Sequence, residues 1–308
     1  MSESAVSSPV VVVTGANGFV GSRVCAALVD RGAGVRAVVR RPGTAPDLPG
    51  VEEHVGEFHD PDLAAAVVAG AAAVVTTVHP LGGDRESQQR VAVEGTPVLA
   101  RAARDAGVER LVHVSTAAVY DRSPGRGDVD ESAALVGDDA NDYAVTKRDT
   151  DLALAEVDGL TRVLVRPPAI LGSGETSVWN SVRPAELRDD EAERRATPGQ
   201  TFAWVHVADL AALLADLAVG RIPTTEDPAR GPVTGGCTAV NVAGTEPATV
   251  RDYVETVTNA LGVEPVWSED RVWTGQILSD RARAWGWAPT VSLTDALAEL
   301  AGDVRSLR

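Results

Sequence analysis

Tyr143 and Lys147 are the residues whose types and spacing most directly indicate chemistry. They lie four residues apart in Asp142-Tyr-Ala-Val-Thr-Lys-Arg148, and this spacing on a helix places two side chains on one face. An ammonium group beside a phenol favours the phenolate, the form that remains after the phenol has given up its proton. The pair therefore predicts an acid/base tyrosine with a lysine as its electrostatic partner. The alternative is an ordinary surface pair on a helix.

A glycine-rich turn near the N-terminus, Thr14-Gly-Ala-Asn-Gly-Phe-Val-Gly21, is the second chemical signal. Gly15, Gly18 and Gly21 recur every third residue between an apolar run and a helical pattern. Glycines at such a turn let the backbone approach a pyrophosphate, and the helix N-terminus then offers N–H groups to it. The turn predicts a dinucleotide site. The alternative is a tight turn that serves packing alone.

The end of the expected second strand bears on the choice of cofactor. NAD-binding proteins usually carry Asp or Glu there to hold the ribose hydroxyls. This chain has Arg40 and Arg41 instead, with Arg36 upstream. A guanidinium can bind a 2′-phosphate through two hydrogen bonds, so the sequence favours NADP(H) over NAD(H). The alternative is that these arginines are solvated surface charges.

The elements that must position these residues follow an alternation of strands and helices. This alternation predicts an α/β fold, a Rossmann-type doubly wound parallel sheet with a smaller C-terminal substrate-binding lobe. The expected dinucleotide-binding domain spans 1–168 with returns at about 201–245, and the smaller lobe spans 169–200 and 246–308. Expected strands are 10–13, 35–39, 73–78, 110–114, 161–165 and 239–242, and expected helices are 22–31, 63–69, 90–106, the Tyr143 helix to about 157, 205–219 and 249–261.

Composition and charge argue against nucleic acid partners, membrane partners and a metal site. The 308 residues carry a formal charge of −16, which disfavours nucleic acid and anionic membrane partners. The sequence has no apolar run of 18 residues, so we expect no membrane span. Cys25 and Cys237 match no metal or redox spacing, which predicts no metal site and a reducing, cytoplasmic setting. The first eight residues are expected to form a disordered tail and not a signal peptide.

Several motifs in order resemble the extended branch of the short-chain dehydrogenase/reductase superfamily. The resemblance covers most of the chain and rests on the glycine turn, Val114-Ser-Thr-Ala-Ala-Val-Tyr120, the Tyr143–Lys147 pair, Arg166-Pro-Pro-Ala-Ile-Leu-Gly172, Val205-His-Val-Ala-Asp-Leu210 and Trp285-Gly-Trp-Ala-Pro289. It implies that Tyr143 is the acid/base, that Lys147 also holds the nicotinamide ribose, and that Thr116, with Ser115 as the alternate, is the helper hydroxyl. Homodimers are common in this branch.

The resemblance also implies which residues contact the cofactor. They come from the glycine turn, from the segments after the expected strands, and from the segment expected along the nicotinamide. They are Gly15, Asn17, Gly18, Phe19, Val20, Gly21, Arg40, Arg41, Glu57, Phe58, Thr77, Val78, Lys147, Pro167 and Ile170.

Departures from the family pattern narrow the reaction. Dehydratases of the branch carry an acidic pair where this chain has Ala117-Ala118, and many nucleotide-sugar epimerases carry Arg-Asp where it has Phe202-Ala203. The stretch Val35-Arg-Ala-Val-Val-Arg-Arg-Pro42 is similar to that of dihydroflavonol-reductase-like enzymes, which use NADPH. We therefore expect an NADP(H)-dependent ketoreductase or alcohol dehydrogenase acting on a carbonyl or secondary alcohol. The alternatives are a nucleotide-sugar epimerase that retains NAD(P) and a non-catalytic NADP(H) sensor.

Candidate substrate contacts flank the expected nicotinamide site. Trp179 offers an apolar face, Asn180 a donor and an acceptor, and Arg183 a cation, while Trp204 would add a second wall. The alternative is that the tryptophans form the core of the smaller lobe. His79 and Ala118 complete the set, and a histidine that is only packed is the alternative for His79.

Overall fold

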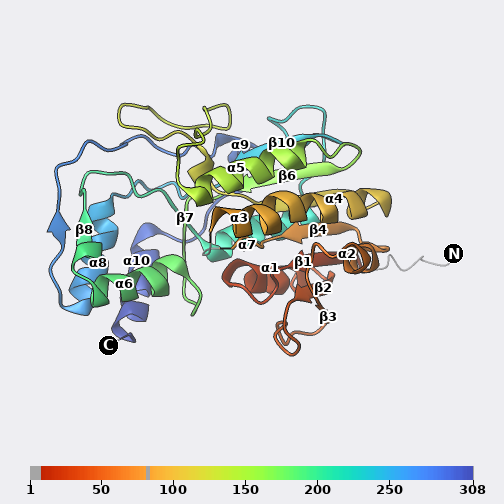
Figure 1. Cartoon of the computed structure of the whole chain (residues 1–308), viewed down its shortest axis with the longest axis horizontal. Coiled ribbons are helices and arrows are strands. Elements are labelled where there is room, and N and C mark those ends of the chain that lie inside the picture. Colours follow the sequence, from red (N-terminus) through yellow and green to blue (C-terminus); the bar gives the residue numbers. More distant parts are fainter. Residues whose placement is uncertain (1–7, 81–83, 308) are drawn as a thin grey trace. The chain divides into compact units, whose positions relative to one another are not determined.

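The computed structural model describes residues 8–80 and 84–307 (Figure 1), so the predicted N-terminal tail lies almost entirely outside the described residues. The strands are β1 (Val10–Thr14), β2 (Gly34–Val39), β3 (Val51–Val55), β4 (Ala73–Thr76), β5 (Arg110–Val114), β6 (Thr161–Arg166), β7 (Ala169–Leu171), β8 (Arg195–Ala196), β9 (Trp204–His206), β10 (Cys237–Asn241) and β11 (Val266–Trp267).

The α-helices are α1 (Phe19–Val29), α2 (Pro61–Val68), α3 (Arg85–Gln88), α4 (Gly95–Asp105), α5 (Asp142–Ala155), α6 (Arg183–Asp189), α7 (Val207–Ala218), α8 (Val250–Leu261), α9 (Asp280–Ala284) and α10 (Leu293–Arg305). The described residues also form π-helical segments at η1 (Gln89–Glu94) and η3 (Val178–Val182) and 3₁₀-helical turns at η2 (Ala117–Val119) and η4 (Ala192–Arg194).

A seven-stranded sheet in the order β10-β6-β5-β4-β1-β2-β3 confirms the predicted Rossmann-type fold. The neighbours β4-β5, β1-β4, β1-β2 and β2-β3 pair in parallel. Val11, Val12 and Val13 of β1 are fully buried, as expected of a strand covered on both faces. The order runs outward from β1 in one direction through β2 and in the other through β4. Such a reversal places a ligand crevice at the carboxyl ends of β1 and β4, where the glycine turn and Thr77 follow.

Differences from the predicted elements have local causes. β3 was missed because Glu52, Glu53 and His54 interrupt its apolar pattern, and polar residues are tolerated at the sheet edge that β3 forms. The predicted helix over 205–219 was wrong in its first residues, since β9 ends at His206 before α7 begins. No helix was predicted over the residues of α10, although Ser292 is a typical N-cap and accepts a hydrogen bond from the Asp295 N–H.

The chain divides into two compact units. The first comprises the described residues up to Val114 with Asn141–Leu164 and Ala211–Thr238, and the second comprises Ser115–Ala140, Val165–Leu210 and the chain from Ala239 onward. The predicted domain boundaries placed 115–140 with the dinucleotide-binding part. In the structure this segment joins the second unit because Val119 and Tyr120 share a core cluster with Trp273.

Each unit has its own packing. In the first, α4 contacts both α2 and α5, and Arg31 at the end of α1 forms an ion pair with Asp216 of α7 at 2.8 Å. In the second, α8 and α10 pack together over a core that includes Leu171, Phe202, Trp204, Tyr253 and Leu300.

Candidate functional site

Helix α5 carries the predicted acid/base pair within the first unit. Asn141 caps the helix by accepting the Ala144 N–H at 3.0 Å, which fixes the first turn where Tyr143 lies. Lys147 follows one turn later and is only 3% exposed. Its Nζ donates to the carbonyl of Val114, the last residue of β5, at 2.7 Å. The structure therefore places the ammonium group at the carboxyl end of a central strand, on the helix face that also bears Tyr143.

Burial changes the acidity of Lys147. Desolvation lowers the pKa of its ammonium from 10.5 to about 8, and the buried Asp151, one turn further along α5, opposes that shift. A lysine with this pKa is still mostly charged at neutral pH. It can therefore stabilise a phenolate on Tyr143.

This burial predicts a pH-dependent stability. The unfolded chain holds the Lys147 proton more tightly than the folded protein between pH 8 and 10.5, so stability should rise with pH above about 8. Cys25 has the opposite effect on stability. Burial raises the pKa of its thiol from 9.0 to about 12, so this residue makes stability fall as the pH rises above about 9. Between pH 8 and 9 we expect Lys147 to raise the free energy of unfolding by about 1 kcal/mol, measured by urea denaturation. Lys147→Met should remove that rise, and an unchanged slope in the variant would contradict the assignment.

His79 lies against Tyr143 in the first unit. The two rings meet edge to face with centroids 5.1 Å apart, and His79 Nε2 is 3.4 Å from the Thr146 hydroxyl. Burial and the nearby Lys147 charge lower the pKa of His79 to about 2, so its imidazole is neutral at physiological pH. These contacts favour the interpretation of His79 as a packed residue that supports the Tyr143 ring, and not as a residue that contacts a ligand.

The glycine turn is closed by contacts that leave no room for side chains. Gly15 has a φ of +68°, and a Cβ there would lie 2.7 Å from Thr77 Oγ1 and 3.0 Å from a Val78 methyl carbon. A Cβ on Gly21 would lie 2.0 Å from the Gly15 carbonyl oxygen. Gly18 precedes α1 as its N-cap and donates its N–H to Gly15 at 2.9 Å. The structure thus brings the turn, Thr77 and Val78 together at the ends of β1 and β4, with Phe19 and Val20 opening the helix.

The loop after β2 touches the glycine turn. Asn17 Nδ2 donates to Thr44 Oγ1 at 3.2 Å, and Glu53 holds the loop by accepting the N–H groups of Gly43, Thr44 and Ala45. This contact brings the segment that follows Arg40 and Arg41 to the same end of the sheet as the turn.

The arginines near this loop differ in whether their guanidinium groups already have hydrogen-bond partners. Arg40 and Arg41 are exposed, and their guanidinium groups form no hydrogen bond or ion pair with any described residue. Arg36, by contrast, donates to the carbonyls of Val67 and Ala69 at 2.7 Å each. The first two are free to meet a ligand, whereas Arg36 ties β2 to the end of α2. After β3, Phe58 is buried and Glu57 is exposed.

The predicted helper hydroxyls lie in the second unit. Ser115 donates its N–H to Val165 O and Ala117 donates to Pro167 O, each at 2.8 Å. Thr116 caps η2 by accepting the Ala118 N–H at 3.1 Å, and no described residue accepts its hydroxyl proton. Thr116 can therefore donate to a substrate oxygen. Ser115 Oγ is buried and without a hydrogen-bond partner among the described residues.

Most of the predicted substrate residues of the second unit already contact other residues of that unit. Trp179 meets Phe202 and Tyr253 edge to face, with centroids 5.2 and 5.3 Å apart. Trp204 is 2% exposed and donates from Nε1 to Glu246 O. Arg183 forms ion pairs with Glu186 and Glu193. These positions favour the alternative reading, in which the tryptophans form the core of this unit.

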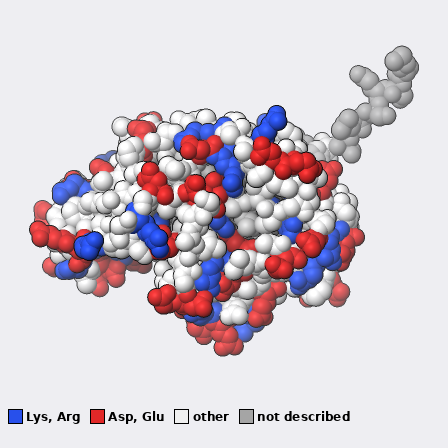
Figure 2. Space-filling view, turned by 90° about the horizontal axis from the view of Figure 1, so that it is seen from above, with Lys and Arg blue, Asp and Glu red and all other residues white. Residues whose placement is uncertain are grey.

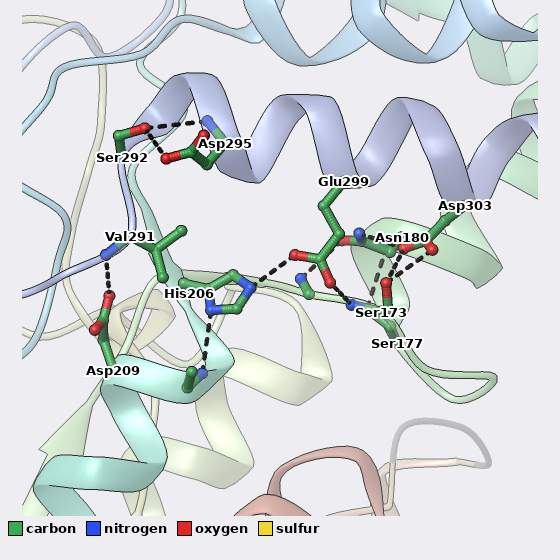
Figure 3. A network of polar contacts seen from close by, with 12 residues as sticks. Ser173, Ser177, Asn180, His206, Asp209, Val291, Ser292, Asp295, Glu299 and Asp303 are labelled. Carbon is green, nitrogen blue, oxygen red and sulfur yellow. Dashed lines mark hydrogen bonds and ion pairs between the residues drawn. The ribbon is translucent and has the colours of Figure 1, made fainter.

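Asn180 belongs to a polar network that joins α10 to the loop after β7 (Figure 3). Its amide oxygen accepts from Gly172 N at 3.0 Å, and its Nδ2 donates to Asp303 at 2.9 Å. Ser173 also donates to Asp303 from its hydroxyl, and Glu299 accepts from Ser173 N and lies 2.9 Å from His206 Nε2. Sequence reasoning did not identify Glu299 and Asp303, although their spacing of four residues on an amphipathic helix was the available signal.

The described residues also bear on the predictions about metal sites, membrane spans and surface charge. Over the part of the chain that the structure describes, no group of three His, Cys, Asp or Glu residues could hold a metal ion. None of the helices in the described ranges is long and apolar enough to cross a membrane. On the face drawn in Figure 2, acidic side chains are scattered among basic ones.

Comparisons with known proteins identify the family of the chain. A family model described as NAD(P)H-binding matches residues 15–219. A 2-alkyl-3-oxoalkanoate reductase of Stenotrophomonas maltophilia is 30% identical over 83% of this chain and 77% of its own length. A 3β-hydroxysteroid dehydrogenase/isomerase of Mycobacterium tuberculosis is 33% identical over 58% of this chain, but the match spans only 51% of that protein.

Solved structures share the fold. A short-chain dehydrogenase/reductase superfamily protein from Agrobacterium tumefaciens with bound NAD superposes with a TM-score of 0.76 at 22% identity, covering 97% of this chain and 98% of its own. UDP-glucose 4-epimerase of Thermotoga maritima gives 0.75 at 19% identity, covering 97% and 99%. With the glycine turn, the Tyr143–Lys147 helix and the NAD(P)H-binding match, the chain belongs to the extended branch of the short-chain dehydrogenase/reductase superfamily.

Proposed function

We propose that the protein is an NADP(H)-dependent oxidoreductase that interconverts a carbonyl compound and a secondary alcohol. The observation that carries the proposal is Lys147, buried to 3% exposure at the end of β5 and one helical turn from Tyr143. A binding protein without chemistry has no need to bury an ammonium group beside a phenol. The similarity to a 2-alkyl-3-oxoalkanoate reductase over 83% of the chain supports reduction of a carbonyl.

Each predicted site residue has its own role in the proposed carbonyl reduction. A nicotinamide cofactor held at the glycine turn would supply the hydride that the carbonyl carbon accepts. Tyr143 donates its proton to the carbonyl oxygen, and Thr116, whose oxygen already accepts the Ala118 N–H, donates a second hydrogen bond to it. Lys147 stabilises the phenolate that remains on Tyr143, because its charge is poorly solvated by water. The first turn of α1 and the glycine turn would hold the pyrophosphate of the cofactor.

The same proposal assigns the 2′-phosphate of NADPH to Arg40 and Arg41. Both side chains are exposed, and their guanidinium groups form no hydrogen bond or ion pair with the described residues. The Asn17–Thr44 hydrogen bond keeps their loop at the glycine turn. A phosphate bound by one guanidinium contributes about 1.5–3 kcal/mol, which corresponds to about a 10- to 100-fold preference for NADPH over NADH.

A fluorescence titration with both cofactors tests this assignment. NADPH should bind more tightly to the wild type, and Arg40→Ala should lose most of the preference while its NADH affinity stays unchanged. Arg101→Ala, at an exposed position of α4, is the matched control and should keep the preference. Tighter binding of NADH by the wild type would contradict the assignment. A cofactor that copurifies and does not exchange would instead favour the nucleotide-sugar epimerase.

A further inference from the structure

Arg122 in the second unit is a half-buried cation that rests on an aromatic ring. It follows η2 by three residues, and its guanidinium carbon lies 5.6 Å from the ring centroid of Trp273. Trp273 is 4% exposed, and its Nε1 donates to Gly127 O at 3.0 Å. The ring is therefore held at its Nε1 edge, so it presents a fixed face to the guanidinium.

The four acidic residues between positions 121 and 131 accept hydrogen bonds from other partners. Asp121 accepts from Ser123 and Arg126, and Asp128 accepts from the Gln276 N–H at 2.8 Å. Asp130 accepts from Ser132. Glu131 accepts from the Asn241 N–H and lies 3.8 Å from Arg281. Arg122 forms no hydrogen bond or ion pair with any residue in the described ranges, although the chain has 44 acidic residues against 28 basic ones.

Leaving this cation without an anion has a free-energy cost. A guanidinium carries five N–H donors and no acceptor, and burial without a paired charge is unfavourable. Desolvation correspondingly lowers the pKa of Arg122. The contact with the Trp273 ring offsets only part of this cost, since a cation–π contact contributes about 0.5–2 kcal/mol. An anionic ligand would supply the missing partner.

Arg122 also lies in the part of the second unit that carries the helper hydroxyl. Trp273 packs in one apolar cluster with Ala117, Val119 and Tyr120, and Ala117 begins the turn that Thr116 caps. A ligand bound at Arg122 would therefore lie beside the segment that begins with Thr116.

We propose that Arg122 binds an anionic group of the substrate, a carboxylate or a phosphate, so that the substrate of the proposed carbonyl reduction is an anion and not a neutral ketone. This inference rests on the proposed function for the identity of the ligand as a substrate. It does not rest on it for the existence of the anion site. A carboxylate and a phosphate both match the two-pronged geometry of a guanidinium, and the following experiment separates them.

The experiment compares three probes: 3-oxooctanoate, its methyl ester, and UDP-glucose. Binding to the NADP⁺-loaded protein is measured by calorimetry, and NADPH oxidation is measured in parallel with the two ketones. We expect one of the two anions to bind. Arg122→Gln should weaken that binding about 10- to 100-fold, the size of one charge-assisted hydrogen-bond pair, and Arg122→Lys should weaken it less. Tighter binding of 3-oxooctanoate than of its ester indicates a carboxylate, and binding of UDP-glucose alone indicates a phosphate.

Arg126→Gln is the matched control. Arg126 is an exposed cation of the same loop that is already paired with Asp121 at 2.7 Å, and its loss should leave binding of the anion unchanged. The proposal is overturned if neither anion binds the wild type, or if Arg122→Gln binds it as tightly as the wild type does. It is also overturned if Arg122→Gln weakens the ester and the acid alike, because a structural role would affect both. Binding of 3-oxooctanoate that depends on Arg122 but leads to no NADPH oxidation would support the anion site and contradict the proposed reduction of this ketone.

Discussion

Replacing Tyr143 by phenylalanine is expected to lower kcat for carbonyl reduction by about 100- to 10,000-fold, the usual contribution of a positioned general acid. The substitution removes only the hydroxyl. The ring keeps its edge-to-face contact with His79, and Lys147 keeps its hydrogen bond to Val114. Affinity for NADPH and the free energy of unfolding should therefore stay close to those of the wild type. The measurements are steady-state NADPH oxidation with a panel of ketones and 3-oxo acids, fluorescence titration with NADPH, and urea denaturation.

The control for this prediction is Tyr253→Phe. Tyr253 is buried in the core of the second unit and donates its hydroxyl to the Trp179 carbonyl at 2.8 Å. Its loss should reduce stability by about 1 kcal/mol and leave kcat nearly unchanged. If Tyr143→Phe retains wild-type turnover, Tyr143 is not the proton donor and the proposed mechanism fails. If both variants lose turnover together with stability, the effect is structural.

Substituting Gly21 by alanine is expected to abolish NADPH binding and to destabilise the first unit. The added Cβ would lie 2.0 Å from the carbonyl oxygen of Gly15, 2.8 Å from its carbonyl carbon and 3.1 Å from Ala16 Cα. All three atoms belong to the backbone, so no side chain can rotate away, and the start of α1 must move from β1. Overpacking of this kind costs about 1–3 kcal/mol. The turn that would hold the pyrophosphate moves with the helix, so the cofactor loses its N–H donors.

Gly34→Ala is the matched control for Gly21→Ala. Gly34 begins β2, and the nearest atom to an added Cβ there is a Val10 methyl carbon at 3.7 Å, an ordinary contact. Thermal unfolding and NADPH titration of both variants separate a general effect of alanine from the clash at the turn. Equal stability and equal NADPH affinity of Gly21→Ala and the wild type would show that the turn tolerates a side chain, against the geometry described above.

The fold could be predicted because its signals are local. Four adjacent valines in β1 identify a strand covered on both faces, and the glycines that follow require a tight approach of α1 to β1. β3 escaped prediction because the apolar alternation is weak in a strand at the sheet edge. The second unit was harder to predict, since its core assembles residues distant in sequence, such as Leu171, Tyr253 and Leu300.

The candidate site divides in the same way. The sequence by itself determined the identity and spacing of Tyr143 and Lys147, the glycine turn and the arginines after β2, because each depends on residues within one turn or one strand end. Only the tertiary structure decided that Lys147 is buried with a pKa lowered to about 8, since desolvation depends on what packs around a side chain. It alone showed that Asn180 is buried in a satisfied network. It alone also set Arg122 on Trp273, 151 residues away in the chain, with Asp121, Asp128, Asp130 and Glu131 engaged elsewhere. Pairing of charges is a property of distances in space, which a linear pattern does not contain.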